Sequence, residues 1–167
     1  MDQLFMSDSN ERKYRGPMPQ SEKDVLYQLA KGLEHIHSMS LIHRDVKPAN
    51  ALIWVGYDET GSNEKVLMKW ADFGLSKRVN ERGTHSMSGD RGTNNWKAPE
   101  LLELEEEETV DWENQRGTTK SDVFCEGLVF AYFLSNGKHP YGSSDIKIPI
   151  NILNGRLVNT QGKSSIA

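Results

Sequence analysis

Four polar residues in the first half of the chain have the types and spacing needed to act on a phosphate group. Asp45, Lys47 and Asn50 lie close together in the sequence, and Asp72 follows downstream. Carboxylate and amide oxygens are the ligands that a hard cation such as Mg²⁺ prefers. A further carboxylate can accept the proton of a hydroxyl, and a lysine can contact phosphate as a point charge. The set therefore suits phosphoryl transfer, in which positioning and charge neutralisation supply most of the rate.

These residues belong to two short motifs, and a third motif follows them in the chain. In chain order the motifs are His43-Arg44-Asp45-Val46-Lys47-Pro48-Ala49-Asn50, Asp72-Phe73-Gly74 and Ala98-Pro99-Glu100. A three-residue match often arises by chance: alone, Asp72 is most simply a turn residue, and Asp45 is half of a surface ion pair. The length of the first motif and the order of all three favour one shared site instead.

Helices are expected on both sides of these motifs. Apolar residues from Val25 to Ile36 repeat at helical spacing, which predicts a helix that Ser21 caps and that ends near residue 38. A second, strongly apolar helix is predicted over residues 122–134. Ser121 is its expected cap, and Asn136-Gly137 is its expected end.

A small β ribbon is expected between the first two motifs. Ala51–Val55 and Val66–Trp70 are short apolar stretches around a turn-rich segment, which predicts two paired strands. This ribbon would hold Asn50 and Asp72 at adjacent ends. The sequence as a whole predicts a mainly α fold with this one ribbon.

The chain resembles the eukaryotic protein kinases over about residues 1–142. Within them it is most similar to the inositol-requiring unfolded-protein-response kinase/endoribonucleases and the related ribonuclease L. The closer similarity rests on five segments. They are Leu33-Glu34-His35-Ile36-His37-Ser38, Trp96-Lys97-Ala98-Pro99-Glu100, Ser121-Asp122-Val123-Phe124, Gly137-Lys138-His139-Pro140-Tyr141-Gly142 and Asn151-Ile152-Leu153-Asn154-Gly155.

The resemblance implies a protein Ser/Thr kinase that uses ATP and Mg²⁺. It makes Asp45 and Lys47 the catalytic residues, and Lys47 at this position follows the Ser/Thr-kinase pattern. The metal ligands would be Asn50 and Asp72. The ATP-binding residues would be Lys47, Asn50, Leu52 and Asp72, with Leu52 forming the floor under the adenine.

The resemblance also implies structural roles for residues around this site. His43 and Phe73 would stack in the regulatory spine. Asp122 would hold the backbone of the turn that contains His43, and Thr93 would hydrogen-bond near Asp45. The implied structural residues are His43, Arg44, Phe73, Gly74, Thr93, Glu100 and Asp122.

Residues 72–100 correspond, by the same resemblance, to the activation segment, a loop whose phosphorylation switches many kinases. Arg44 marks a kinase of this switched type, because a guanidinium binds phosphate through two parallel hydrogen bonds. Ser86 and Ser88 are the first predicted phosphorylation sites, and Thr84 is the next.

Several parts of a whole kinase domain have no counterpart in the sequence. No Gly-rich loop and no strand lysine precede His43, and no helical pattern closes the chain after residue 153. We therefore expect residues 1–167 to be a partial kinase domain, a protein-kinase-like C-terminal lobe truncated at both ends, and inactive alone. The rival interpretation is a non-catalytic, kinase-like interaction module or an inactive fragment.

The net charge of −4 comes from 24 acidic and 20 basic residues, and one local segment sets its sign. We interpret that segment, residues 103–118, as an acidic insertion, and its Glu105–Glu108 run as a solvated loop. The single cysteine, Cys125, excludes an intrachain disulfide and fits a chain that faces the cytosol.

The expected partners are a protein substrate and a second copy of the kinase, for phosphorylation in trans. The four tryptophans are too scattered for a stacking platform, so we expect no nucleic-acid binding from this segment. No apolar stretch approaches the roughly 20 residues of a membrane span. An anchor of the parent protein in the endoplasmic reticulum membrane would lie outside this chain.

Overall fold

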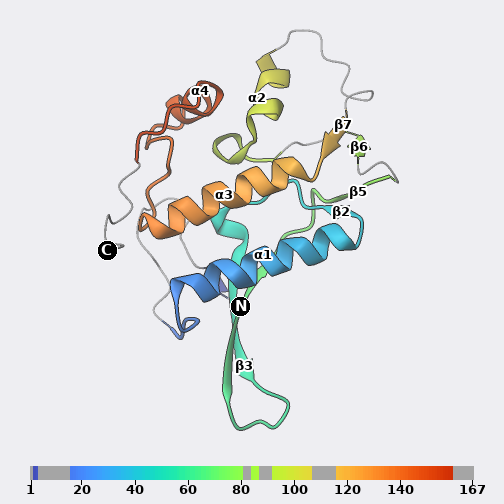
Figure 1. The fold of residues 1–167 in the computed structure, drawn as a ribbon, viewed down its shortest axis with the longest axis vertical. Coiled ribbons are helices and arrows are strands. Elements are labelled where there is room, and N and C mark those ends of the chain that lie inside the picture. Colours follow the sequence, from blue (N-terminus) through green and yellow to red (C-terminus); the bar gives the residue numbers. More distant parts are fainter. Residues whose placement is uncertain (1, 4–15, 81–83, 87–91, 107–115, 160–167) are drawn as a thin grey trace.

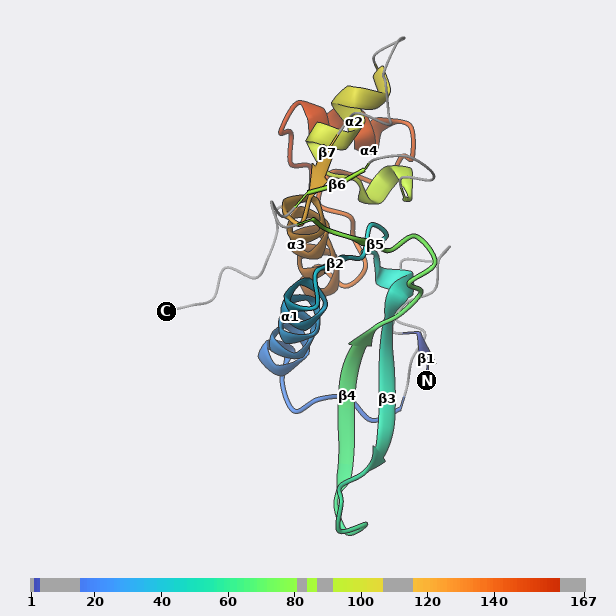
Figure 2. The ribbon, with the colours of Figure 1, turned by 90° about the vertical axis from the view of Figure 1, so that its right-hand side faces the viewer.

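The computed structural model describes residues 2–3, 16–80, 84–86, 92–106 and 116–159. In chain order the elements are β1 (Asp2–Gln3), α1 (Glu22–Ser38), β2 (Leu41–Ile42), η1 (Pro48–Asn50), β3 (Ala51–Tyr57), β4 (Glu64–Trp70), β5 (Lys77–Arg78), β6 (Thr84–Ser86), η2 (Asn94–Trp96), α2 (Pro99–Glu106), β7 (Arg116–Thr118), α3 (Lys120–Leu134) and α4 (Lys147–Leu153). Helices α1 and α3 lie side by side at the centre (Figure 1). Helices α2 and α4 form one end of the molecule, and the β3–β4 ribbon extends from the other (Figure 2).

Helix α1 begins and ends where the sequence pattern predicts. The Ser21 hydroxyl accepts a hydrogen bond from the Asp24 backbone N–H at 3.1 Å, which satisfies one of the free donors of the first turn. The side chains at helical spacing form one buried stripe, Val25, Leu29, Leu33 and Ile36. This stripe joins α1 to the main hydrophobic core.

The predicted ribbon is confirmed and is longer than the apolar stretches indicate. Strands β3 and β4 pair antiparallel from Ala51 opposite Trp70 to Tyr57 opposite Glu64. The Trp70 indole N–H donates to the Leu29 carbonyl of α1 at 3.0 Å, which fixes the ribbon on the helix. The ends of the two strands meet, because the Ala71 N–H donates to the Asn50 carbonyl at 3.0 Å.

Helix α3 is apolar on nearly every side and is buried as a central helix. Its predicted end is confirmed: Asn136 and Gly137 follow it with φ of +52° and +82°. Its predicted cap is wrong. Thr119 precedes the first helical residue, and Ser121 lies inside the first turn, where its hydroxyl donates to the Thr118 carbonyl at 2.8 Å.

Helices α2 and α4 enclose a second, smaller core with α3, built from Leu102, Leu128, Ile148 and Ile152. Helix α2 extends to Glu106, so the loop predicted for Glu105–Glu108 is wrong for its first two residues. The last two lie outside the described residues.

The described part of the chain contains four α-helices and three small antiparallel sheets, with strand orders β1-β3-β4, β2-β5 and β6-β7. This is more β structure than the single predicted ribbon. The added strands are short, and two of them, β5 and β6, lie within residues 72–100, the segment that the resemblance makes a loop. No helix of the described residues is long and apolar enough to cross a membrane.

Candidate active site

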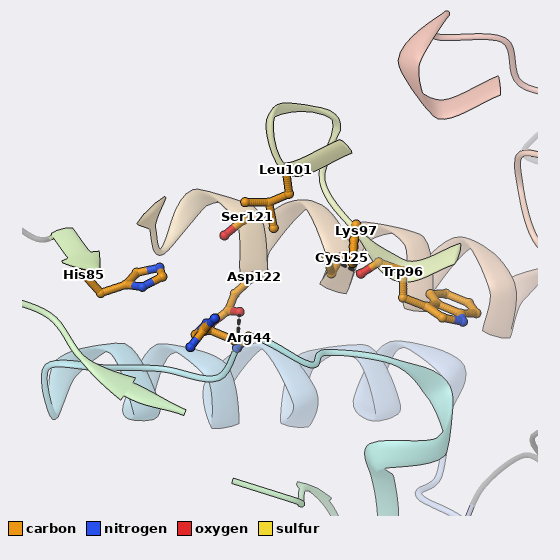
Figure 3. A pocket seen from close by; sticks show the side chains of 8 residues that line it. All are labelled: Arg44, His85, Trp96, Lys97, Leu101, Ser121, Asp122 and Cys125. Carbon is orange, nitrogen blue, oxygen red and sulfur yellow. Dashed lines mark hydrogen bonds between the residues drawn. The ribbon is translucent and has the colours of Figure 1, made fainter. Parts of the chain in front are cut away.

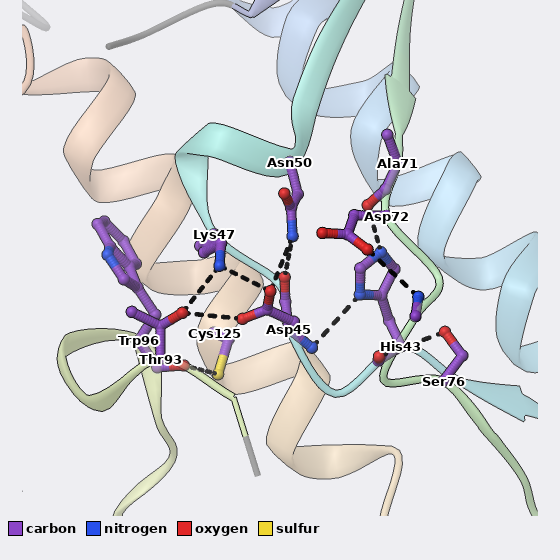
Figure 4. A network of polar contacts seen from close by, with 11 residues as sticks. His43, Asp45, Lys47, Asn50, Ala71, Asp72, Ser76, Thr93, Trp96 and Cys125 are labelled. Carbon is purple, nitrogen blue, oxygen red and sulfur yellow. Dashed lines mark hydrogen bonds and ion pairs between the residues drawn. The ribbon is translucent and has the colours of Figure 1, made fainter. Parts of the chain in front are cut away.

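Lys47 and Asn50 of the first motif and Thr93 contact the buried side chain of Asp45 (Figure 4). The Lys47 ammonium lies 2.7 Å from one Asp45 carboxylate oxygen, and the Thr93 hydroxyl donates to the other at 3.0 Å. Lys47 also donates to the Thr93 hydroxyl at 2.9 Å. The three side chains therefore form a closed polar network, and Thr93 reaches it from a distant part of the sequence.

Asn50 and Asp72 lie next to this network, at the paired ends of β3 and β4 (Figure 4). The Asn50 amide nitrogen donates to the carbonyl and to a carboxylate oxygen of Asp45, at 2.8 and 3.1 Å. These bonds orient the amide and leave its oxygen as the atom available to a cation. Asp72 has a φ of +63°, and its carboxylate accepts from the Gly74 N–H at 3.3 Å.

This donor set fits a hard divalent cation. Asn50 and Asp72 together offer oxygen atoms only, which is the preference of Mg²⁺. Among the described residues no group of three or more His, Cys, Asp and Glu side chains is arranged to hold a metal ion. Mg²⁺ usually takes one or two protein oxygens and keeps water and phosphate oxygens as its other ligands, which this pair of residues allows.

His43 joins the first motif to the second. Its fully buried ring contacts Phe73, with 5.0 Å between ring centroids. Its Nε2 lies 3.0 Å from the Ala71 carbonyl, and its Nδ1 lies 3.4 Å from the Asp45 N–H. Because the carbonyl only accepts and the N–H only donates, these contacts select the tautomer that carries its proton on Nε2.

Asp122 anchors the turn before Asp45 from the first turn of α3. It is 2 % exposed. Its carboxylate accepts from the backbone N–H groups of His43 and Arg44, at 2.8 and 2.9 Å. His37 of α1 adds a third contact, 2.9 Å from Nε2 to the carboxylate. The role of His37 was not predicted from the sequence, although its position four residues after Leu33 places it on the apolar face of α1.

Gly92 is a second residue that the sequence analysis missed. Its φ is +91°, and a Cβ on it would lie 2.6 Å from the Arg44 carbonyl oxygen. Only glycine fits so close an approach with this backbone conformation. The close approach places the next residue, Thr93, against Asp45.

The remaining predicted residues lie further from Asp45. Leu52 is half-buried on β3, and Glu100 is exposed in α2, without an ion pair among the described residues. Thr84 lies in β6, where its hydroxyl donates to Asn80 at 3.1 Å. Ser86 ends the same strand, and Ser88 lies outside the described residues.

A small pocket lies on the other side of the Arg44 turn (Figure 3). Its lining includes the basic residues Arg44, His85 and Lys97 and the acidic residue Asp122. Lys97 forms an ion pair with Glu105 at 2.7 Å. Cys125, also in the lining, donates its thiol proton to the Trp96 carbonyl, and burial raises the pKa of this thiol. Cys125 is therefore a packing residue and not a nucleophile.

Comparison with known protein families gives the same family as the motifs do. A family model described as "Protein kinase domain" matches residues 5–164. The chain belongs to the protein kinase family. The family resemblance predicted from the sequence is thereby confirmed.

Two of the three relatives described next carry a second activity, that of an endoribonuclease, in their names. The chain is 44 % identical over 133 residues to the human serine/threonine-protein kinase/endoribonuclease IRE2, a match that covers 78 % of the chain and 13 % of that protein. It is 36 % identical over 138 residues to the Caenorhabditis elegans kinase/endoribonuclease ire-1, covering 80 % and 13 %. The Schizosaccharomyces pombe "sensor for unfolded proteins in the ER ire1" is 33 % identical over 130 residues, covering 71 % and 12 %. The chain thus spans about an eighth of the length of these relatives.

Proposed function

We propose that the protein containing this chain transfers the γ-phosphate of ATP to Ser or Thr hydroxyls of proteins. The observation that carries the proposal is the network in which Asp45 is held by Lys47, Thr93 and Asn50, next to Asp72. A buried carboxylate beside a lysine and an oriented amide provides the positioning that phosphoryl transfer needs.

Each residue of the network has a separate task in this proposal. Asp45 orients the substrate hydroxyl and accepts its proton. Lys47, already 2.7 Å from Asp45, neutralises charge on the phosphate that is transferred. Thr93 donates to Asp45 and accepts from Lys47, so it sets the distance between the base and the cation.

Asn50 and Asp72 would hold Mg²⁺, and Leu52 on β3 would contact the adenine. When bound, Mg²⁺ neutralises charge on the nucleotide phosphates. The chain's own contribution is orientation, since Asp45 fixes the Asn50 amide and the paired strand ends bring Asp72 beside it. His43 and Asp122 hold the two segments in place, because Asp122 accepts from the His43 N–H and the His43 ring contacts the Ala71 carbonyl.

Residues 72–100 would form a regulatory activation segment, with phosphorylation at Thr84, Ser86 or Ser88. The supporting observation is that His85 of β6, which lies between Thr84 and Ser86, lines the same small pocket as Arg44. A phosphate on this segment would bring negative charge near the Arg44 guanidinium.

We also propose a setting for the whole protein from the relatives' names. It would be part of a cytosolic-facing kinase of the unfolded-protein response, anchored in the endoplasmic reticulum membrane and phosphorylated in trans by a second copy. Truncations of the gene product, examined by membrane fractionation, test this setting.

The test of the catalytic proposal is phosphate transfer from ATP to a Ser/Thr peptide by the full-length protein. Asp45→Asn should lower the rate at least ~100-fold, because a positioned general base contributes roughly that much. Glu103→Gln, an exposed change on α2, is the matched control and should be neutral. Near-normal turnover of Asp45→Asn would refute the assignment.

A further inference from the structure

Thr93 directs its side chain away from the short helix that it precedes. It lies just before η2, the position at which a threonine hydroxyl usually accepts from a backbone N–H of the helix. The hydroxyl makes no such bond here. It donates to Asp45 at 3.0 Å and accepts from Lys47 at 2.9 Å instead. The position of η2 has to be set by other residues, and Thr93 is placed with it.

Lys97 supplies one such contact from the residue after η2. Its ammonium donates to the Asn94 side-chain oxygen at 2.7 Å and to both carboxylate oxygens of Glu105, at 2.7 and 2.9 Å. An ammonium has three N–H donors, so each of them has an acceptor. Lys97 therefore connects the residue next to Thr93 to helix α2.

This ammonium is buried, since Lys97 is only 5 % exposed. Lysine is almost never fully buried unless it is paired, because removing a charge from water is unfavourable and only well-placed acceptors offset the cost. An apolar side chain of similar volume often stabilises a fold as well as a buried ion pair does. The charge therefore indicates a task other than stability, and the Asn94 side chain is what it orients.

The other side-chain contacts of η2 hold its later residues. The Asn95 amide donates to Asp145 at 2.7 Å, and the Cys125 thiol donates to the Trp96 carbonyl at 3.0 Å (Figure 4). These bonds hold the second and third residues of η2. The ammonium holds the first, Asn94, which is bonded directly to the threonine of the Asp45 network.

We propose that Lys97 is a positioning residue for phosphoryl transfer that acts through Thr93 on Asp45. The inference rests on the proposed function, because it assigns a task to a side chain beside the proposed base. By holding Asn94 against α2, the ammonium keeps the Thr93 hydroxyl within hydrogen-bond distance of the Asp45 carboxylate. A displaced Thr93 leaves the base poorly oriented and slows the transfer step. The proposed metal ligands, and with them the binding of Mg²⁺-ATP, are not affected.

The test is phosphate transfer from ATP to a Ser/Thr peptide by the full-length protein, with Mg²⁺-ATP affinity measured by calorimetry. Lys97→Met should lower kcat at least ~10-fold, because a misplacement of about 1 Å can cost up to ~100-fold in rate. Its affinity for Mg²⁺-ATP should stay within about twofold of the wild type. Asn94→Ala, an exposed change that removes only the acceptor next to Thr93, should have the same two effects. Glu103→Gln, an exposed change two residues before Glu105, is the control and should change neither value.

A double variant separates positioning from a structural role. Thr93→Val removes the hydroxyl through which Lys97 is proposed to act, so adding Lys97→Met to it should lower kcat by less than about twofold more. If Lys97→Met does not fold, Asn94→Ala replaces it in this comparison. A structural residue would lower kcat by the same factor with and without the Thr93 hydroxyl.

Three results would overturn the proposal: equal factors in the two backgrounds, a loss of Mg²⁺-ATP affinity along with kcat in Asn94→Ala, or an unchanged kcat in that variant. Failure of the proposed function gives a different result. In that case the wild type transfers no phosphate, or Asp45→Asn keeps its turnover.

Discussion

The loss of the Asp122 carboxylate should destabilise the chain more than any surface change. Asp122→Ala removes the acceptor of two backbone N–H groups, those of His43 and Arg44, and of the His37 ring. Each buried donor left without a partner costs about 1–3 kcal/mol. The two backbone groups alone therefore give a loss of roughly 4 kcal/mol, a large share of the ~5–15 kcal/mol by which domains are stable.

Urea unfolding of the 167-residue chain, followed by circular dichroism, measures this loss. Asp122→Asn keeps one oxygen acceptor but turns an amide N–H toward the other donor, so about half the loss is expected. Glu103→Gln should stay within about 0.5 kcal/mol of the wild type, as exposed changes usually do. A loss below about 1 kcal/mol for Asp122→Ala would show that the turn before Asp45 is not held by this carboxylate.

Three further predictions follow from local geometry. Gly92→Ala should lower the free energy of unfolding by about 2 kcal/mol, because a Cβ there would lie 2.6 Å from a carbonyl oxygen at positive φ; an unchanged urea midpoint would contradict this. Burial raises the pKa of Glu126 from 4.5 to about 7, so this group makes the free energy of unfolding fall as pH rises from 4.5 to 6.5. Burial lowers the pKa of His139 from 6.5 to about 4, so this group makes the free energy of unfolding rise over the same pH range. Across this pH range the urea midpoint of Glu126→Gln should rise more steeply with pH than that of the wild type, and the midpoint of His139→Asn should fall. Profiles parallel to the wild type would disprove the shifted pKa values of these two groups. Cys125 should react with a thiol reagent only after unfolding, because its thiol is buried and its pKa is raised; labelling of the native chain at the rate of a free thiol would show otherwise.

Local patterns predicted the elements that carry the site. The stripe of α1 and its Ser21 cap are encoded within a few residues, and so are the two strands that bring Asn50 beside Asp72. The cap of α3 was misplaced because Ser121 and Thr119 are both suitable residues, and only the helix geometry separates them.

Contacts between distant segments could not be predicted from the sequence pattern. His37 and Asp122 are 85 positions apart, and nothing near either residue indicates the partner. The lack of a hydrogen-bond partner for Glu126 Oε1 could not be predicted either, because a single acid in an apolar helix is equally consistent with an ion pair. The motif residues could be named only because their chemistry is recognisable without knowledge of their neighbours.

The most direct test of the proposed site is the Mg²⁺ dependence of ATP binding by the full-length protein. Asp72→Asn should weaken binding of Mg²⁺-ATP at least tenfold, because it removes the only carboxylate assigned to the metal. Asp45→Asn should leave that affinity within about twofold while removing phosphate transfer, because Asp45 acts on the substrate hydroxyl. Calorimetry with the two variants in parallel should show this split. Equal ATP affinity in wild type and Asp72→Asn, or loss of binding in Asp45→Asn alone, would contradict the assignment of metal ligand and base.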